Sequence, residues 1–397
     1  MTLHRTVNGL LIENTNETGL VNAMNAIFPF GLPHPTAVYV TLFLLTFVLH
    51  QAFMHYVLAG SLYLTWATIQ QGRMTHLIEQ PLAATLRDWM PFLLSAAITA
   101  GVAPLLFIQI VYQYQFYTAN LLLWWRWGVV VPVLIVGFYL LYLIKSRMLW
   151  SWPYAARVAV VLATSSSFVF VGFCWTINHL LANSEANWPE IYTTGRLPFT
   201  VITVILRMLV WIGGSFATMS VIVGWQLQYR QLSQPDGSTV AGPRELAGMS
   251  ICGLVTALLA ATAYVVLSGA ASKSVVFGTF SLPYVLLGIS GAILQTIGWS
   301  LQWRSNRLES FGLMLSTLGS LMTLFGVSVI REAIRISAVD FVSLYPRHAE
   351  AAKVGGFGVF VVAAVAVILV IVWCVRLVKT GMHDTGNDLS IQDRPAS

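Results

Sequence analysis

The chain has 397 residues, of which 57% are hydrophobic and only 9% are charged, and its formal net charge is +6. Soluble domains carry about 25% charged residues, so this composition cannot cover a water-facing surface. One membrane domain with short loops is expected instead. In such a protein the excess of Lys and Arg is a topology signal, and no nucleic-acid partner is predicted.

The first 36 residues are predicted to form an outer N-terminal segment. They lack the basic region, apolar core and small-residue cleavage site of a cleavable signal peptide. The first span is therefore expected to act as an uncleaved signal.

A helix needs about 20 apolar residues to cross about 30 Å of hydrocarbon. Nine segments meet this requirement: Ala37–Ile69, Trp89–Tyr112, Leu121–Ile144, Val158–Leu181, Phe199–Trp225, Ala247–Ala270, Phe280–Trp299, Phe311–Ile330 and Val354–Val375. The expected fold is all-α, a polytopic membrane helix bundle over residues 37–379 with a cytoplasmic tail over 380–397.

The first segment is longer than a single crossing needs. Counting about 20 residues back from Arg73 places its crossing part near Gln51–Gln70. Residues 37–50 would then project outward or lie along the outer surface.

Charges in the short loops predict the orientation. Lys145–Arg157 and Arg304–Arg307 are basic, whereas Asn183–Thr194 carries Glu185 and Glu190 and no base. The N-terminus is therefore expected outside and the C-terminus in the cytoplasm. This topology indicates a multi-pass protein of the bacterial inner membrane, in contact with lipid.

Ionisable side chains at membrane depth are costly and mark candidate functional sites. His50 and His55 lie about 140° apart around the first span, so one is expected to bind a cofactor while the other pairs with a neighbour. His55 is the first choice as a haem ligand, with the small residues Ala59–Ser61 leaving room for a flat macrocycle. Each imidazole is equally consistent with a satisfied interior histidine.

Arg207 on the fifth span requires an anionic partner, which is expected to be a propionate, a carboxylate or a lipid phosphate, or failing those a quinone oxygen. Pairing with helix carbonyls or a partner subunit is the alternative. No Asp or Glu lies well inside a predicted span, and this disfavours a proton-coupled transporter. The three cysteines fall in apolar segments and indicate small buried residues.

The second span ends in a run rich in Tyr and Gln, from Gln109 to Thr118, with a Trp-rich stretch soon after. Such density is typical of an aromatic belt at the membrane surface. It is also the chemistry of a quinone or haem-edge pocket, because rings stack and amides form hydrogen bonds.

These strings resemble the large subunit of cytochrome bd-type quinol oxidases, between Gln51 and Trp225. His55–Leu62 (HYVLAGSL) is similar to the family's first-span haem-ligand stretch, and Gln113–Asn120 (QYQFYTAN) to its Glu-Phe-Gln-Phe-Gly-Thr-Asn-like string. Leu206–Trp211 (LRMLVW) resembles its fifth-span His-Met-Leu pattern. The resemblance implies nine spans with an outer N-terminus and a haem site on the first span.

The departures from the family restrict this expectation. A haem-ligating glutamate of the family falls on Gln113, and its fifth-span histidine falls on Arg207, which cannot ligate iron. Only a short connection, Ala271–Thr279, stands where the family has its long quinol-binding loop. Oxygen reduction is therefore not expected, and at most one haem b remains near His55, with His179 or Gln113 as its second axial candidate.

The leading hypothesis is an integral membrane subunit of an electron-transfer complex, so any enzymatic role would be that of a membrane oxidoreductase subunit. It would exchange electrons with a quinone pool or anchor a periplasmic cytochrome c beside other membrane subunits. A non-catalytic scaffold, a haem-free quinol-handling subunit and a transporter are the alternatives.

Overall fold

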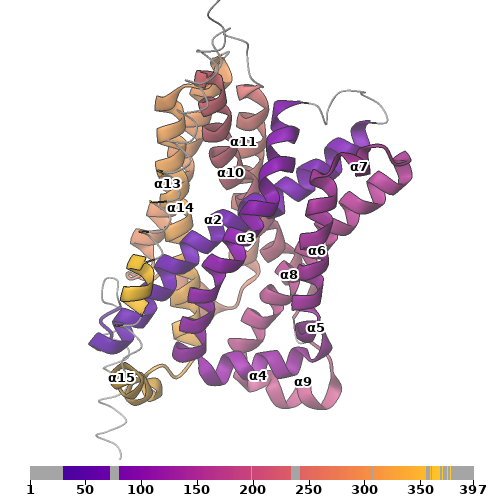
Figure 1. Cartoon of the computed structure of the whole chain (residues 1–397). Coiled ribbons are helices and arrows are strands. Elements are labelled where there is room, and N and C mark those ends of the chain that lie inside the picture. Colours follow the sequence, from indigo (N-terminus) through magenta and orange to yellow (C-terminus); the bar gives the residue numbers. More distant parts are fainter. Residues whose placement is uncertain are drawn as a thin grey trace, which may run out of the picture. The chain divides into compact units, whose positions relative to one another are not determined.

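The computed structural model describes residues 30–71, 80–197, 199–233, 242–305 and 307–354, together with scattered positions from 358 to 376. Every regular element in these residues is a helix (Figure 1). The chain divides into two compact units, Met1–Ser343 and Leu344–Ser397. The described part of the second unit includes α15 (Tyr345–Lys353), on which His348 is buried.

The first unit is built from eight long helices with short connecting helices. The long ones are α2 (His34–Gln71), α3 (Pro81–Val111), α6 (Val130–Lys145), α8 (Tyr154–Ala182), α10 (Val201–Ser233), α11 (Pro243–Leu267), α13 (Leu282–Arg304) and α14 (Ser310–Ala338). The short ones are α4 (Gln113–Leu123), α5 (Trp125–Gly128), α7 (Arg147–Trp150), η2 (Glu185–Asn187), α9 (Trp188–Thr194) and α12 (Ala270–Val276).

Eight stretches of the described chain are long and apolar enough to cross a membrane. Each coincides with one of the first eight predicted spans, so the expected all-α polytopic bundle is confirmed. The ninth predicted span, Val354–Val375, falls largely outside the described residues. The direction in which the helices cross stays a prediction.

Most predicted boundaries differ from the structure by several residues, and two of these differences affect the argument. The third span was expected from Leu121, but α4 ends at Leu123 and Trp124 has a φ of 55°, which breaks the helix before α5. The eighth was expected to end at Ile330, but α14 continues to Ala338. The extension matters because it carries charged residues into the bundle.

Helix α2 is the central element of the first unit. Its 38 residues make a helix about 57 Å long, and Figure 1 shows it running obliquely past α3. Residues 37–50 were expected to project outward or lie on the outer surface. Instead this half packs against two other candidate spans, with the Tyr39 and Phe107 ring centroids 6.3 Å apart and Arg335 of α14 5.6 Å from the Phe43 ring.

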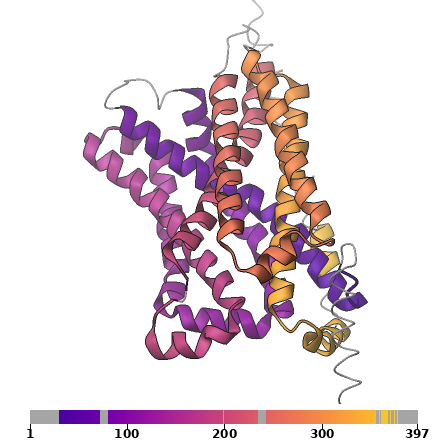
Figure 2. The same ribbon diagram turned by 180° about the vertical axis from the view of Figure 1, so that it is seen from behind.

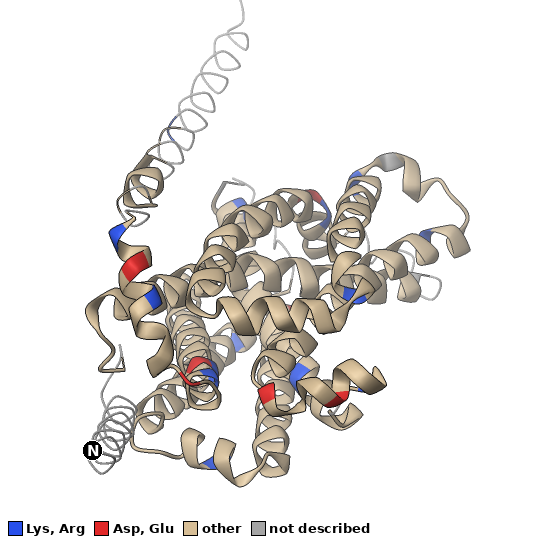
Figure 3. Cartoon of the chain, turned by 90° about the horizontal axis from the view of Figure 1, so that it is seen from below, with Lys and Arg blue, Asp and Glu red and all other residues tan. Residues whose placement is uncertain are grey.

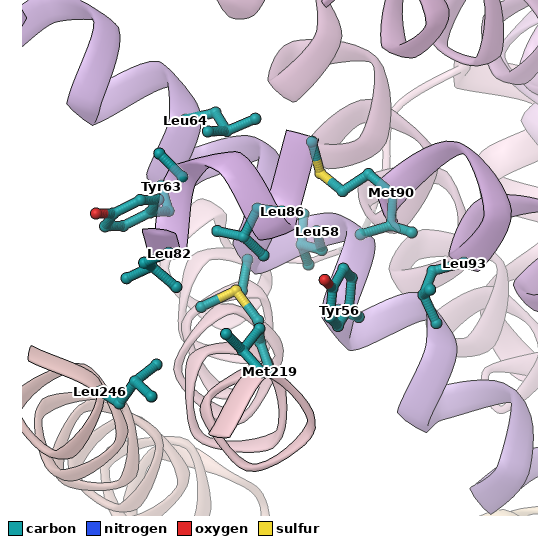
Figure 4. Close-up of a cluster of buried hydrophobic side chains, with 14 of the residues drawn as sticks. Tyr56, Leu58, Tyr63, Leu64, Leu82, Leu86, Met90, Leu93, Met219 and Leu246 are labelled. Atoms are coloured by element: carbon teal, nitrogen blue, oxygen red, sulfur yellow. The ribbon is translucent and has the colours of Figure 1, made fainter. Parts of the chain in front are cut away.

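Apolar side chains fill the space between α2, α3, α10 and α11. Figure 4 shows Tyr56 and Leu58 of α2, Met90 of α3 and Met219 of α10 in this cluster, and all four are buried. Outward-facing positions are also apolar: Phe92 is 62% exposed, for example. A surface of this kind suits contact with lipid chains, and charged residues are sparse on the described helices (Figure 3).

Glycines bring two helix pairs into backbone contact. A Cβ atom added to Gly319 of α14 would lie 2.5 Å from the carbonyl oxygen of Gly291 on α13, and one added to Gly213 of α10 would lie 2.5 Å from that of Gly253 on α11. Figure 2 shows α13 and α14 side by side. Small residues are the usual means of close helix packing in membranes, because apolar burial gives no advantage between lipid-facing helices.

Candidate functional site

The polar residues of α2 bind it to three different helices. His50 Nδ1 lies 2.9 Å from the carbonyl oxygen of Ala97 on α3, and Ser328 of α14 donates to Gln51 Oε1 at 3.0 Å. His55 Nδ1 lies 3.1 Å from Thr218 Oγ1 on α10. The two histidines therefore face different helices, as their spacing predicts.

The bonds of His55 determine which of its nitrogens carries the proton. Thr218 donates its single hydroxyl hydrogen to the carbonyl oxygen of Gly214 at 2.9 Å, so it can only accept from the imidazole. His55 Nδ1 is consequently the N–H donor, and Nε2 keeps its lone pair. This is the tautomer that a haem-ligating histidine needs.

The surroundings of His55 differ from the expectation in two respects. Thr218 lies 17 residues into α10, about 26 Å along the helix, so His55 lies beside the middle of α10, whereas a crossing part of Gln51–Gln70 would place it near one end of its span. The space expected beside Gly60 is occupied, because a Cβ added there would lie 3.0 Å from Met90 Sδ and 3.2 Å from Leu86 of α3.

A second polar region lies where α3, α8 and α14 end and α10 begins. Arg207 Nη2 of α10 donates to His179 Nδ1 of α8 at 3.0 Å, and the Arg207 guanidinium lies 5.5 Å from the Tyr264 ring of α11. The sequence placed these two residues on separate spans without pairing them. The structure brings them into direct contact.

This contact determines the tautomer of His179, which is the opposite of that of His55. A guanidinium can only donate, so His179 Nδ1 accepts and Nε2 carries the proton of the neutral ring. His179 is 4% exposed, and its Nε2 has no hydrogen-bond partner. A free N–H of this kind suits an oxygen acceptor, whereas iron ligation requires a lone pair.

The extension of α14 adds charged residues that lie beyond the predicted end of the eighth span at Ile330. Glu332 and Arg335 are 0% and 3% exposed, with 3.5 Å between Glu332 Oε2 and Arg335 Nη1. Tyr112, at the end of α3, donates to Glu332 Oε1. Arg331 and Arg335 lie over aromatic rings of α2, 4.9 Å from Phe47 and 5.6 Å from Phe43.

The apolar pattern of the sequence indicates that the eighth helix continues past Ile330. Apolar Val329, Ala333 and Ile336 continue the helical spacing past Ile330, and all three are buried. Helix α14 therefore continues through three charged positions, Arg331, Glu332 and Arg335, that lie beyond the apolar run.

The cluster is densely charged for a membrane protein interior. Arg207, Arg331 and Arg335 all lie close enough to His179 to interact with it electrostatically. Within the described residues, Glu332 is the carboxylate that interacts with Arg331 and Arg335. A ring face contributes about 2 kcal/mol to a desolvated cation, whereas an uncompensated buried guanidinium costs several kcal/mol. The rings offset only part of that cost.

A small pocket with polar and apolar lining opens beside this cluster, between α4, α8 and the last turns of α3 and α14. Its cavity volume is about 10 Å³, room for about one water molecule, and its lining includes Gln115, Phe116, Asn178, Asn183 and Arg335. The side-chain oxygens Gln115 Oε1 and Asn183 Oδ1 are buried without a hydrogen-bond partner. The pocket therefore offers two acceptors, a flat ring and a cation.

Gln113, the cofactor candidate from the sequence, lies outside this arrangement. It is exposed at the start of α4, whereas Gln115 is buried and donates to Glu185 Oε1 at 2.8 Å. Two residues correspond to about 200° on a helix, so only one of the two glutamines can face the bundle.

No family model, curated protein or solved structure matches the chain. Among the described residues, no group of three or more His, Cys, Asp or Glu side chains could hold a bare metal ion. The resemblance to the bd-type large subunit thus stays a prediction.

Proposed function

We propose that the chain is an integral membrane subunit of an electron-transfer complex and that it binds a quinol in the pocket between α4, α8 and α14. The observation that carries the proposal is the pair of unpartnered oxygens, Gln115 Oε1 and Asn183 Oδ1. A quinol has two hydroxyl donors and a flat ring, which match the two acceptors and Phe116 in chemistry. The side chains that line the pocket would have to move apart to admit the ring, because the cavity holds about one water molecule.

Quinol oxidation releases two electrons and two protons. The pocket residues would hold the hydroxyls and exclude water, and the electrons would pass to a redox partner outside this chain. A periplasmic cytochrome c bound at the same membrane face is the partner class that the proposal implies.

Replacing Gln115 with Leu tests quinol binding. The variant loses one hydrogen-bond acceptor in a buried pocket, worth about 1.4 kcal/mol, so the affinity should fall about tenfold. Quenching of Trp fluorescence in the purified full chain, titrated with a short-chain quinol, measures that affinity. Gln113→Leu, on the exposed face of the same helix, is the matched control and should bind like the wild type. Equal affinities in all three proteins would reject the pocket.

A haem b on the first span belongs to the same proposal, and Leu86 and Met90, which fill the space beside Gly60, would have to move to admit it. His55 Nε2 has the lone pair that iron needs, and haem when bound supplies one-electron transfer. His55→Ala should abolish the reduced b-type α-band of the purified complex, while His50→Ala should retain it. A spectrum that His55→Ala leaves unchanged, or a wild type without haem, rejects this assignment and leaves a haem-free quinol-handling subunit.

A non-catalytic scaffold is the second candidate. The observation in its favour is that His50, Gln51 and His55 each already form a hydrogen bond that holds α2 to another helix. On this interpretation neither haem nor quinol binds, and replacing His50 or His55 lowers only the stability of the protein.

A further inference from the structure

We infer that the bundle contains a binding site for one anionic oxygen group, a phosphate or a carboxylate. The site is formed by Arg207, Arg331, Arg335 and the Nε2–H of His179. This goes beyond quinol binding, because a neutral quinol needs acceptors whereas this site consists of donors and cations. Arg335 lines both regions, so the two sites are neighbours.

The first argument is charge. Three guanidiniums interact with one another here, and within the described residues Glu332 is the carboxylate paired with them. The cluster thus holds an excess of two positive charges. An anion is the simplest group that would neutralise it in a medium of low dielectric constant.

The second argument is unused hydrogen-bonding capacity. The buried N–H groups of His179 Nε2, Arg331 Nε and Arg335 Nε have no hydrogen-bond partner, and Arg335 Nη1 forms only the 3.5 Å ion pair with Glu332 Oε2. Three unpaired donors on three side chains outnumber the one acceptor of the cluster without a hydrogen bond, Glu332 Oε2, and so indicate a ligand with several acceptor oxygens.

The third argument is how the rings are placed. Aromatic side chains lie against the guanidiniums: Phe47 beside Arg331, Phe43 and Tyr112 beside Arg335, and Tyr264 beside Arg207. A ring covers a guanidinium face and leaves its N–H edge available. The edge is what a phosphate or carboxylate uses.

The depth of the cluster suits a headgroup. His179 and Arg335 lie three residues from the ends of α8 and α14, about 4.5 Å along each helix. Arg207 lies six residues into α10, about 9 Å from its start. At this depth a lipid phosphate and the carboxylate of a bound cofactor are the two sources of the anion that the test distinguishes.

The test is a binding titration of the purified full chain in neutral detergent, without quinol. Dioctanoyl phosphatidylglycerol, dioctanoyl phosphatidylcholine and octanoate are added separately, and melting temperature and native mass spectra are recorded. The phosphate source predicts at least tenfold tighter binding of phosphatidylglycerol than of phosphatidylcholine. The carboxylate source predicts saturable binding of octanoate instead. Failure of both anions to bind overturns the site.

Arg331→Gln removes one cation and should weaken the bound anion at least tenfold. Arg126→Gln, at an arginine that lies over Trp125 on α5, is the control and should leave binding unchanged. Without anion, Arg331→Gln should melt at the same temperature as the wild type or higher, because it relieves repulsion. If Arg331→Gln melts at a lower temperature and still binds the anion with unchanged affinity, Arg331 stabilises the fold without contacting an anion, and the proposal is overturned. Quinol affinity is measured separately, so the two proposals can fail independently.

Discussion

Gly319→Leu should prevent the chain from accumulating as a folded protein. A Cβ at this position would lie 2.5 Å from both the amide nitrogen of Gln295 and the carbonyl oxygen of Gly291 on α13. These are backbone atoms, so no rotamer change relieves the clash, and α13 and α14 must separate. The expected loss is about 3 kcal/mol, the upper end of the usual cost of overpacking.

The measurement is the monodisperse yield and melting temperature of a fluorescent fusion in detergent. Gly288→Ala on α13 is the matched control, because a Cβ there meets nothing within 4 Å, and it should behave like the wild type. A Gly319→Leu variant with normal yield and melting temperature would show that α13 and α14 are not packed backbone to backbone.

Hydropathy alone predicts the eight described spans because apolar length is a property of each segment by itself. It fails where tertiary contact decides the outcome. With residues 37–50 the first apolar segment is longer than one crossing needs. These residues nevertheless lie in the bundle, because α2 is oblique and packs on α3 and α14. Arg331 and Glu332 end the apolar run without ending the helix. The guanidinium of Arg331 lies over the Phe47 ring, and the carboxylate of Glu332 accepts a hydrogen bond from Tyr112, so both charges are stabilised inside the bundle.

The candidate site could be predicted in part. Polar residues at membrane depth identified His55, His179 and Arg207 individually. Their roles depend on contacts between residues far apart in the chain: Thr218 makes His55 Nδ1 a donor, and Arg207 makes His179 Nδ1 an acceptor. No local pattern encodes which tautomer results. The choice between Gln113 and Gln115 likewise depended on the exact rotation of α4, which its weak amphipathic pattern does not specify.

Glu332→Ala is the substitution expected to destabilise the charged cluster most. It removes the carboxylate paired with Arg335 and leaves the buried Tyr112 hydroxyl without its acceptor. Breaking a buried ion pair by removing one partner costs about 3–5 kcal/mol, because the other charge stays buried and uncompensated. The melting temperature of the purified chain should fall clearly, whereas Glu190→Ala, an exposed carboxylate on α9, should leave it unchanged.

Glu332→Gln separates charge from hydrogen bonding at the same position. The amide oxygen can still accept from Tyr112, so the loss should be smaller than for Ala, and what remains measures the charge. Adding Arg335→Met removes the cation as well, so the double variant should be more stable than Glu332→Gln alone. If Glu332→Gln and the double variant melt at the wild-type temperature, charge balance does not hold this end of the bundle together. If charge balance does hold it, Glu332→Gln should also bind phosphatidylglycerol more tightly than the wild type, because its cluster has one more uncompensated positive charge.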